Sequence, residues 1–303
     1  MAGEQHVIDT VTTGLDLYKV TAALIYHVVY EEVTEDMRNV GKTCVLALGY
    51  QGWLGAFTMM ARSYGVSYPK HLREALHKKV WDHAVQTASI PEELNKNKQD
   101  GADARRIVRD GVTERDIFET WARPIIENWR ASHTRITDFW YKANDAAVKA
   151  VLEPGKVFDC GPVLFGMRKD FLHCRLPSNR LLSYYEPKVE QITDKYKRTK
   201  PTVGYMTINS ETNQWERQYG YGGKWVENIT QAVARDLLAE AMLRCEKAGY
   251  TVVLHVHDEI VAEISNRSSL GLEEFYELMT ELPEWAKDCP VTANGWKGNR
   301  YRK

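Results

Sequence analysis

Apolar residues recur every three or four positions through much of the first half of the chain, which is the spacing of a buried helical face. Thr34, followed by Glu35 and Asp36, is a typical N-cap, and Gly65 is typical of a helix end. Tryptophan is frequent among the apolar positions after residue 113. The pattern predicts helices over residues 8–31, 37–50, 53–64 and 113–152, the last as one helix or two.

The spacing changes near residue 153, where short apolar runs alternate with proline and glycine. Helical spacing returns further on and stops before Gly249. The last apolar runs are short, rich in valine and isoleucine, and separated by a few polar residues, as in a hairpin. We predict a strand over 180–185, a helix over 228–247, and a hairpin of strands 250–256 and 260–264.

This change of spacing divides the chain and sets its fold class. We predict an α/β fold of the α+β kind, in which residues 1–205 are mainly helical and residues 206–303 combine helix and strand. Within the first part, residues from about 70 to 112 are polar and predict an exposed excursion. The chain of 303 residues is long enough for one large domain or two ordinary ones.

Composition narrows the class of protein. The chain is 44% hydrophobic and 27% charged, as soluble globular proteins are. A formal net charge of −1 gives no global sign of nucleic-acid binding, so phosphate contacts would fall on local basic runs at 195–200 and 300–303. Five widely spaced cysteines indicate neither a disulfide framework nor a zinc site. Without an apolar run of membrane length or a secretory signal, we expect a cytoplasmic protein with no membrane partner.

Polar residues at the tip of the predicted hairpin are the strongest candidate for chemistry. The two apolar strands enclose His257, Asp258 and Glu259. Adjacent carboxylates at a rigid strand end suit hard divalent cations, which prefer oxygen ligands. A solvated tip is the commoner explanation of such a turn taken alone. Another alternative is a metal-dependent hydrolase that binds its metal through His255 and His257.

Two cations lie one turn apart on the predicted helix that begins after Thr34. Arg38, Lys42 and Leu46 follow i, i+4, i+8 spacing and climb one face, with Tyr50 at the far edge. The small Gly41 and Gly49 are expected to leave this surface open, so that the two cations cradle a polyphosphate and Leu46 and Tyr50 form a floor for a base. A solvated basic face is the commoner explanation of an Arg-x-x-x-Lys pair taken alone.

These motifs occur together and in order, and the combination resembles family A DNA polymerases, the DNA polymerase I group, and especially its phage-encoded members. Residues 38–50, Arg-x-x-x-Lys-x-x-x-Leu-x-x-Gly-Tyr, resemble the nucleotide-binding helix of the fingers. Residues 231–238 resemble the palm helix that touches the primer–template minor groove, and residues 257–259 match the metal-binding turn. Residues 176–180 and 295–301 also look like those of phage-type members.

The resemblance implies roles for the palm and its metal site. Residues 1–205 would form the fingers, and residues 206–303 would form the C-terminal part of the palm. Asp258 would ligate catalytic Mg²⁺, Glu259 would assist near the primer end, and His257 would steady the primer-terminal backbone. These three residues would belong to the catalytic centre.

The resemblance also implies how the nucleotide and DNA are held. Arg38 and Lys42 would bind the phosphates of the incoming dNTP, with Lys42 nearest the reacting phosphate and therefore part of the catalytic group. Tyr50 would stack at the base of the nascent pair. Leu46 stands where many members carry Phe or Tyr, an aromatic residue linked to sugar discrimination. The implied DNA contacts are Gln231, Arg235 and His257.

The family's first metal motif, an Asp followed by an aromatic residue, Ser and an acid three residues on, is missing from the chain. In the family it ends shortly before a segment resembling residues 1–5. We therefore expect a split enzyme, in which this chain is one subunit of a DNA-directed DNA polymerase acting on primer–template and dNTP. A second polypeptide would supply the first metal strand and the thumb, with or without a 3′–5′ exonuclease. Two Mg²⁺ ions would be shared between the chains, and this chain by itself would be inactive.

Two other interpretations stay open. A truncated piece or decayed remnant would bind nucleotide or DNA without catalysis. A remnant freed from selection would lose scattered active-site residues, yet Arg38, Lys42, Gln231 and Asp258 are all in place, which favours the split enzyme. The hydrolase is disfavoured, because its motif usually opens a large β/α barrel and only a short segment follows His257.

Overall fold

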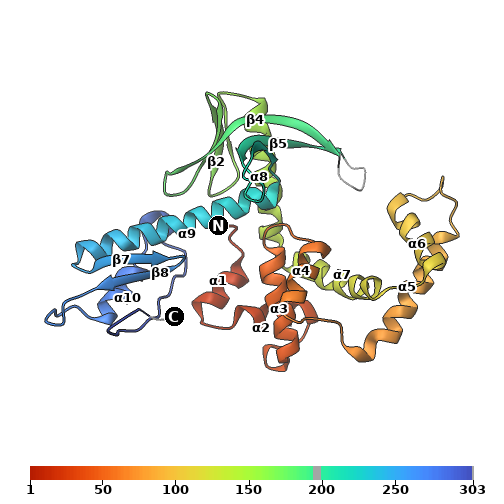
Figure 1. Ribbon diagram of the computed structural model, residues 1–303, viewed down its shortest axis with the longest axis horizontal. Helices are drawn as coiled ribbons and strands as arrows, with labels where there is room; N and C mark the ends of the chain where they lie inside the picture. Colours follow the sequence, from red (N-terminus) through yellow and green to blue (C-terminus); the bar gives the residue numbers. More distant parts are fainter. Residues whose placement is uncertain (194–198, 302–303) are drawn as a thin grey trace. The chain divides into compact units, whose positions relative to one another are not determined.

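The computed structural model describes residues 1–193 and 199–301 and contains both helices and antiparallel sheets, which confirms the α+β class (Figure 1). The chain forms two compact units, described separately below. The helical unit comprises Gly3–Tyr141 and Glu190–Thr202; the sheet unit comprises Met1–Ala2, Lys142–Val189 and Val203–Lys303. The boundary near residue 205 and the names fingers and palm stay predictions.

The helical unit follows the predicted spacing over most of its length. Thr34 caps α3 by accepting a hydrogen bond from the Met37 backbone at 3.3 Å, as expected. The predicted third helix is α4, and the predicted pair of tryptophan-rich helices is α7 and α8, whose end passes into the sheet unit. The helices are α1 (Gln5–Thr12), α2 (Leu17–Tyr26), α3 (Glu35–Leu48), α4 (Leu54–Ser63), α5 (Arg73–Ala88), α6 (Lys98–Asp110), α7 (Glu114–Ser132) and α8 (Thr134–Leu152), with 3-10 turns at Tyr30–Glu32 and Lys70–Leu72.

The single helix predicted over residues 8–31 is wrong, because the chain breaks between α1 and α2. Gly14 adopts a left-handed φ of +71°, which glycine tolerates and which ends a helix. Asp16 then starts α2 by accepting hydrogen bonds from the backbone N–H groups of Tyr18 and Lys19. The apolar positions on both sides of the break keep helical spacing, so periodicity alone did not reveal it.

The polar region around residues 70–112 contains two helices, α5 and α6, which sequence spacing did not identify. They pack on each other through a small apolar cluster of their own and extend away from α7 (Figure 1). The cluster contains few apolar residues because most positions of the two helices are exposed. Its buried members are Val80, Ala84, Ala104 and Ile107.

A buried histidine joins α1 to the α7–α8 junction. His133 is 2% exposed, and its ring stacks on Trp129 with centroids 4.3 Å apart. Its Nδ1 lies 2.8 Å from the Trp129 carbonyl oxygen, which only an N–H can approach favourably, so Nε2 is the acceptor for the His6 Nε2–H at 3.2 Å. Burial, which disfavours the charged imidazolium, lowers the pKa of His133 to about 4.

This histidine predicts a loss of stability in mild acid. An unfolded histidine titrates near 6.5, so between that pH and about 4 the unfolded chain binds a proton that folded His133 refuses. We expect the free energy of unfolding to fall by up to roughly 3 kcal/mol across this window. Urea unfolding at pH 7 and pH 5 should show the loss in wild type and in the exposed control His71→Gln. An equal pH dependence in His133→Gln would contradict this account.

The sheet unit contains most of a six-stranded antiparallel meander whose strands follow one another in chain order, while the adjoining ends of the fourth and fifth strands belong to the helical unit. One face packs on Trp225 at the start of α9, which is fully buried against the rings of Phe165, Tyr184 and Tyr205. This aromatic cluster fixes the sheet to α9. The strands are β1 (Val157–Asp159), β2 (Leu164–Arg168), β3 (Phe171–Arg175), β4 (Leu181–Thr193), β5 (Thr199–Ile208) and β6 (Trp215–Tyr219).

Helix α9 (Gly222–Lys247) begins six residues before its predicted start at 228, while its predicted end near Gly249 is confirmed. The first turns were not predicted because glycine, present at 222 and 223, disfavours a helix. The packing of the buried Trp225 stabilises these turns. The predicted hairpin is also confirmed as β7 (Thr251–Val256) and β8 (Glu259–Glu263), followed by α10 (Leu272–Thr280) and a 3-10 turn at Glu284–Ala286.

The structure shows the state of the cysteines and the character of the helices. All five thiols are free, and four are buried, but Cys289 is exposed. Across the described parts of the chain, no helix has both the length and the apolar character that a membrane span requires.

Candidate functional site

The hairpin presents its polar residues at the tip. Val256 pairs with Glu259, so His257 and Asp258 are the two residues of the turn, and both side chains are exposed. His257 has a left-handed φ of 53°, which costs a residue with a Cβ on the order of 1 kcal/mol and which glycine would adopt more easily. The turn therefore carries an imidazole at a position where backbone geometry alone favours glycine, and a carboxylate directly after it.

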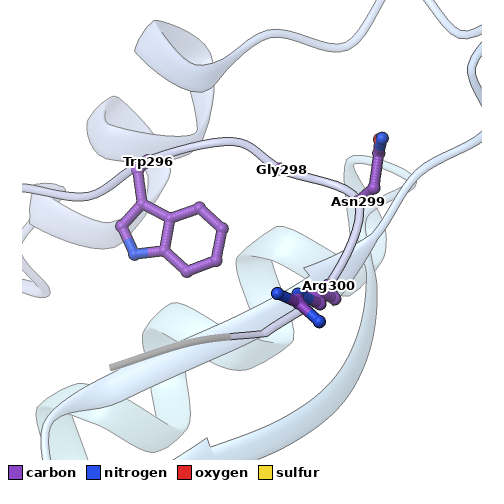
Figure 2. A pocket seen from close by; sticks show the side chains of 4 residues that line it. All are labelled: Trp296, Gly298, Asn299 and Arg300. Atoms are coloured by element: carbon purple, nitrogen blue, oxygen red, sulfur yellow. The ribbon is translucent and has the colours of Figure 1, made fainter.

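Glu259 lies at the first position of β8 and is half-buried. The Tyr301 hydroxyl donates a hydrogen bond to its Oε2 at 2.8 Å, so the C-terminal tail reaches the hairpin. Four residues of this tail, Trp296, Gly298, Asn299 and Arg300, line a small cavity (Figure 2). The cavity measures about 250 Å³, below the size of most ligand pockets, and we assign it no ligand.

Parts of two other candidates are outside the described residues. The basic run at 195–200 is described only for Thr199 and Lys200, and of the tail at 300–303 only Arg300 and Tyr301 are described. In residues 1–193 and 199–301, no group of three or more His, Cys, Asp or Glu side chains is arranged to hold a metal ion. The His255–His257 pair of the hydrolase alternative thus has no third ligand there.

Arg38 of α3 is held by a carboxylate from the neighbouring helix. Its Nε donates to Asp16 Oδ2 at 2.7 Å, while Asp16 Oδ1 accepts from the backbone N–H of Tyr18 at 2.8 Å. Partial burial would raise the pKa of Asp16, but the bonds from Arg38 and from the backbone of Tyr18 and Lys19 outweigh it and lower the pKa. One carboxylate therefore caps α2 and orients the guanidinium of Arg38.

Lys42, one turn further along α3, lies among aromatic rings. Its Nζ is 4.3 Å from the ring centroid of Tyr64 and 5.9 Å from that of Tyr18. The Arg38 guanidinium also lies over Tyr18, at 5.4 Å. Cations over aromatic faces are held without losing their charge. The structure therefore brings Arg38 and Lys42 together on one side of α3, flanking the ring of Tyr18.

The expectation that Gly41 keeps this surface open is wrong. Gly41 is buried, and a Cβ at this position would lie 2.2 Å from the Tyr18 carbonyl oxygen and 3.0 Å from the Ala22 nitrogen. The glycine instead allows α3 to cross α2 at close range, which sets Arg38 beside Asp16.

This close crossing predicts that Gly41→Ala destabilises the chain. The added methyl must push backbone away, and we expect a loss of about 2 kcal/mol in the free energy of unfolding. Gly55 in α4 has no atom within 4 Å of the corresponding position, so Gly55→Ala is the matched control and should be neutral or slightly stabilising. Chemical unfolding of both variants tests this, and an unchanged stability in Gly41→Ala would contradict the close packing of α2 and α3.

The two residues predicted to support the base of the nucleotide, Leu46 and Tyr50, lie at the C-terminal end of α3 and just beyond it. Leu46 is 40% and Tyr50 36% exposed. The loop that follows is fixed from α7 and α8: Trp140 Nε1 donates to the Gly49 carbonyl at 2.8 Å, and Arg130 Nη2 donates to that of Gly52 at 2.8 Å. Sequence reasoning missed these two anchors, because no local pattern links them to a loop so far away in the chain.

On α9, Gln231 and Arg235 are exposed and lie one helical turn apart. The adjacent Asp236 is 9% exposed and accepts hydrogen bonds from Arg180 Nε and Ser178 Oγ, each at 2.5 Å. Arg180 also donates to the Ala232 carbonyl oxygen at 2.9 Å. The turn that resembled phage-type members is therefore fixed to the same helix as the predicted DNA contacts.

Comparison with known proteins gives one similarity that spans the chain. No family model matches it. The chain is 32% identical, over 305 aligned positions that include all of it, to a DNA polymerase of Bacillus phage SP02. It spans 39% of the length of that polymerase. This similarity confirms the expected resemblance to phage-type DNA polymerases, while the assignment to family A stays a prediction.

Proposed function

We propose that this chain is a subunit of a DNA-directed DNA polymerase that transfers a nucleotidyl group from dNTP to a primer 3′-OH under the direction of a template. The whole-chain similarity to a phage DNA polymerase carries this proposal. Two separate groups of side chains support it, one on α3 and one at the tip of the hairpin.

On α3, Arg38 and Lys42 are proposed to bind the triphosphate of the dNTP. Asp16 Oδ2 accepts from Nε of Arg38 at 2.7 Å and Glu35 Oε1 lies 3.5 Å from its Nη1, so two acids orient the guanidinium that we propose to bind phosphate oxygens. Lys42 makes no ion pair with a described carboxylate, so its charge is available to the phosphate under displacement. Leu46 and Tyr50 would support the base and the sugar.

At the hairpin tip, Asp258 is proposed to ligate Mg²⁺ and Glu259 to assist from the adjacent position. The exposed carboxylate of Asp258 offers the oxygen donors that Mg²⁺ prefers, so it fits the ion, while the half-buried Glu259 already accepts a hydrogen bond from Tyr301. When bound, a pair of Mg²⁺ ions would stabilise the charge on the attacking and leaving oxygens. His257 would steady the primer-terminal backbone, and Gln231 with Arg235 would contact the primer–template.

The second metal-binding carboxylate is proposed to come from another polypeptide. A two-metal centre needs carboxylates from separate strands, and the tip of this hairpin offers only the neighbours Asp258 and Glu259. Val253 and Leu254 of β7 are 51% and 44% exposed, which gives a partner strand apolar surface to cover. The partner would carry the first metal motif and the thumb, with or without a 3′–5′ exonuclease, and would act with this chain in the cytoplasm.

Photo-crosslinking of the complex with a radiolabelled azido-purine dNTP tests the nucleotide site. We expect the label on peptides of α3 and the loop after it, between Arg38 and Tyr50, and we expect unlabelled dNTP to compete it away. Labelling spread over exposed lysines, or labelling that dNTP does not reduce, would contradict the proposed site. A catalytically inactive binding module would show the same label without primer extension.

A further inference from the structure

The six-stranded sheet has a second face, opposite Trp225, on which several aromatic rings are exposed. Leu172 and Tyr184 are buried on the side of Trp225, as described above. Their neighbours Phe171 and Tyr185 point the opposite way, because side chains alternate along a strand, and they pair with each other across β3 and β4. We call this opposite side the outer face.

Aromatic rings form a continuous group on the outer face. Phe171 lies 5.1 Å from Tyr185, and Tyr185 lies 6.3 Å from Trp215, measured between ring centroids. His173 stacks beside Phe171 at 5.9 Å. Phe171 is 36%, Trp215 57% and Tyr219 43% exposed, unusual values for rings on a sheet that already has an aromatic core on its other side.

Arginines border these rings. Arg168 pairs with Phe171 across β2 and β3, and Arg175 lies two positions beyond His173 on the same face. Both guanidinium groups are exposed, and neither forms an ion pair with a described carboxylate. Arg217 reaches the same face from β6, where its Nη1 donates to the carbonyl oxygens of Glu186 and Gly204 at 2.9 Å each.

Two acids, Glu186 and Asp170, lie near the ring of Tyr185 and affect its pKa. A side-chain hydrogen bond to Glu186, with the nearby charges of Glu186 and Asp170, raises the pKa of Tyr185. Tyr185 therefore stays a neutral phenol that offers a flat face. The unpaired Arg168 and Arg175 lie on strands β2 and β3, toward the other edge of the sheet.

We propose that the outer face binds a single-stranded polynucleotide, with bases stacked on Phe171, Tyr185 and Trp215 and phosphates contacted by Arg168 and Arg175. Exposed rings offer stacking surfaces only to unpaired bases, and arginines supply the charge that the phosphate backbone attracts. A second protein could also pack against the rings. It would then bury the arginines, which is unfavourable unless that protein supplies a carboxylate to pair with each of them. The inference does not rest on nucleotidyl transfer, and it concerns residues outside the α3 and hairpin sites.

Fluorescence anisotropy with labelled dT20, rU20 and a 20-base-pair duplex tests this on the purified chain. The double variant Phe171→Ala/Trp215→Ala should bind both single strands about tenfold or more weakly and bind the duplex with little change. Trp81, 38% exposed on α5, provides the matched control, so Trp81→Ala should leave all three affinities unchanged. Trp215→Phe keeps a stacking surface and should retain most of the affinity.

The charges are tested separately through salt. Arg168→Gln/Arg175→Gln should reduce the slope of log K against log salt for dT20 by roughly 1.4, the value for two phosphate contacts on a single strand. Arg109→Gln/Arg115→Gln, at two exposed arginines already paired with acids, is the control. Equal single-strand affinity in wild type and the aromatic double variant, with unchanged melting temperature, would overturn the proposal. A loss of the same size on the duplex would overturn it too.

Discussion

Asp258→Asn is expected to silence primer extension by the polymerase complex. The substitution keeps the size of the side chain but removes the negative charge that we propose to bind Mg²⁺ at the hairpin tip. A bound metal ion supplies several kcal/mol of transition-state stabilisation, so the rate of extension should fall by roughly 10³-fold or more. Single-turnover incorporation on a defined primer–template, with saturating dNTP and Mg²⁺, measures this.

The matched control is Asp288→Asn, at another exposed aspartate of the same unit. It should leave incorporation unchanged. Because Asp258 is exposed on a turn, its substitution should also leave the melting temperature and DNA affinity close to wild type. Incorporation by Asp258→Asn at a rate within a few fold of wild type would contradict a metal-binding role for this carboxylate.

Lys42→Met is expected to reduce nucleotide incorporation on the order of 100-fold while changing DNA affinity little. The Lys42 ammonium would face the phosphate on which charge is redistributed during displacement, so its loss weakens binding of the transition state more than binding of DNA. Pre-steady-state incorporation over a range of dNTP concentrations separates the maximal rate from the apparent dNTP affinity. Filter binding or anisotropy with primer–template measures DNA affinity in parallel.

Lys149→Met, at an exposed lysine of α8, is the control and should match wild type in both assays. A loss of incorporation in Lys42→Met that is matched by an equal loss of DNA binding would indicate a general electrostatic role. Unchanged incorporation would show that Lys42 has no role in nucleotidyl transfer and only packs beside Tyr18 and Tyr64.

Elements with strong local signals were predictable from sequence. Thr34 followed by two acids marked the start of α3, and the spacing of Arg38 and Lys42 correctly placed both on one side of that helix. The hairpin was predictable because two valine- and isoleucine-rich runs enclose only a few polar residues. In these cases the determining residues are neighbours in the chain, so the sequence displays them directly.

Features that depend on distant residues were not predictable. Nothing local shows that Asp16 would hold Arg38, because the pairing requires the break at Gly14 and the close crossing at Gly41. The early start of α9 depends on the packing of Trp225 against three strands. The outer face of the sheet was likewise invisible, since its rings come from β3, β4 and β6 and meet only through strand pairing.

We propose that this chain becomes a polymerase only with a second polypeptide that supplies the other metal-binding carboxylate. The direct test mixes the purified chain with a candidate partner that ends in the Asp-aromatic-Ser-x-x-acid motif, and follows primer extension with dNTP and Mg²⁺. We expect the mixture to extend primers, neither component alone to do so, and the mixture to lose activity when either Asp258 or the partner's motif aspartate is changed to Asn. Template-dependent extension by the purified chain alone, unaffected by Asp258→Asn, would contradict the two-chain mechanism.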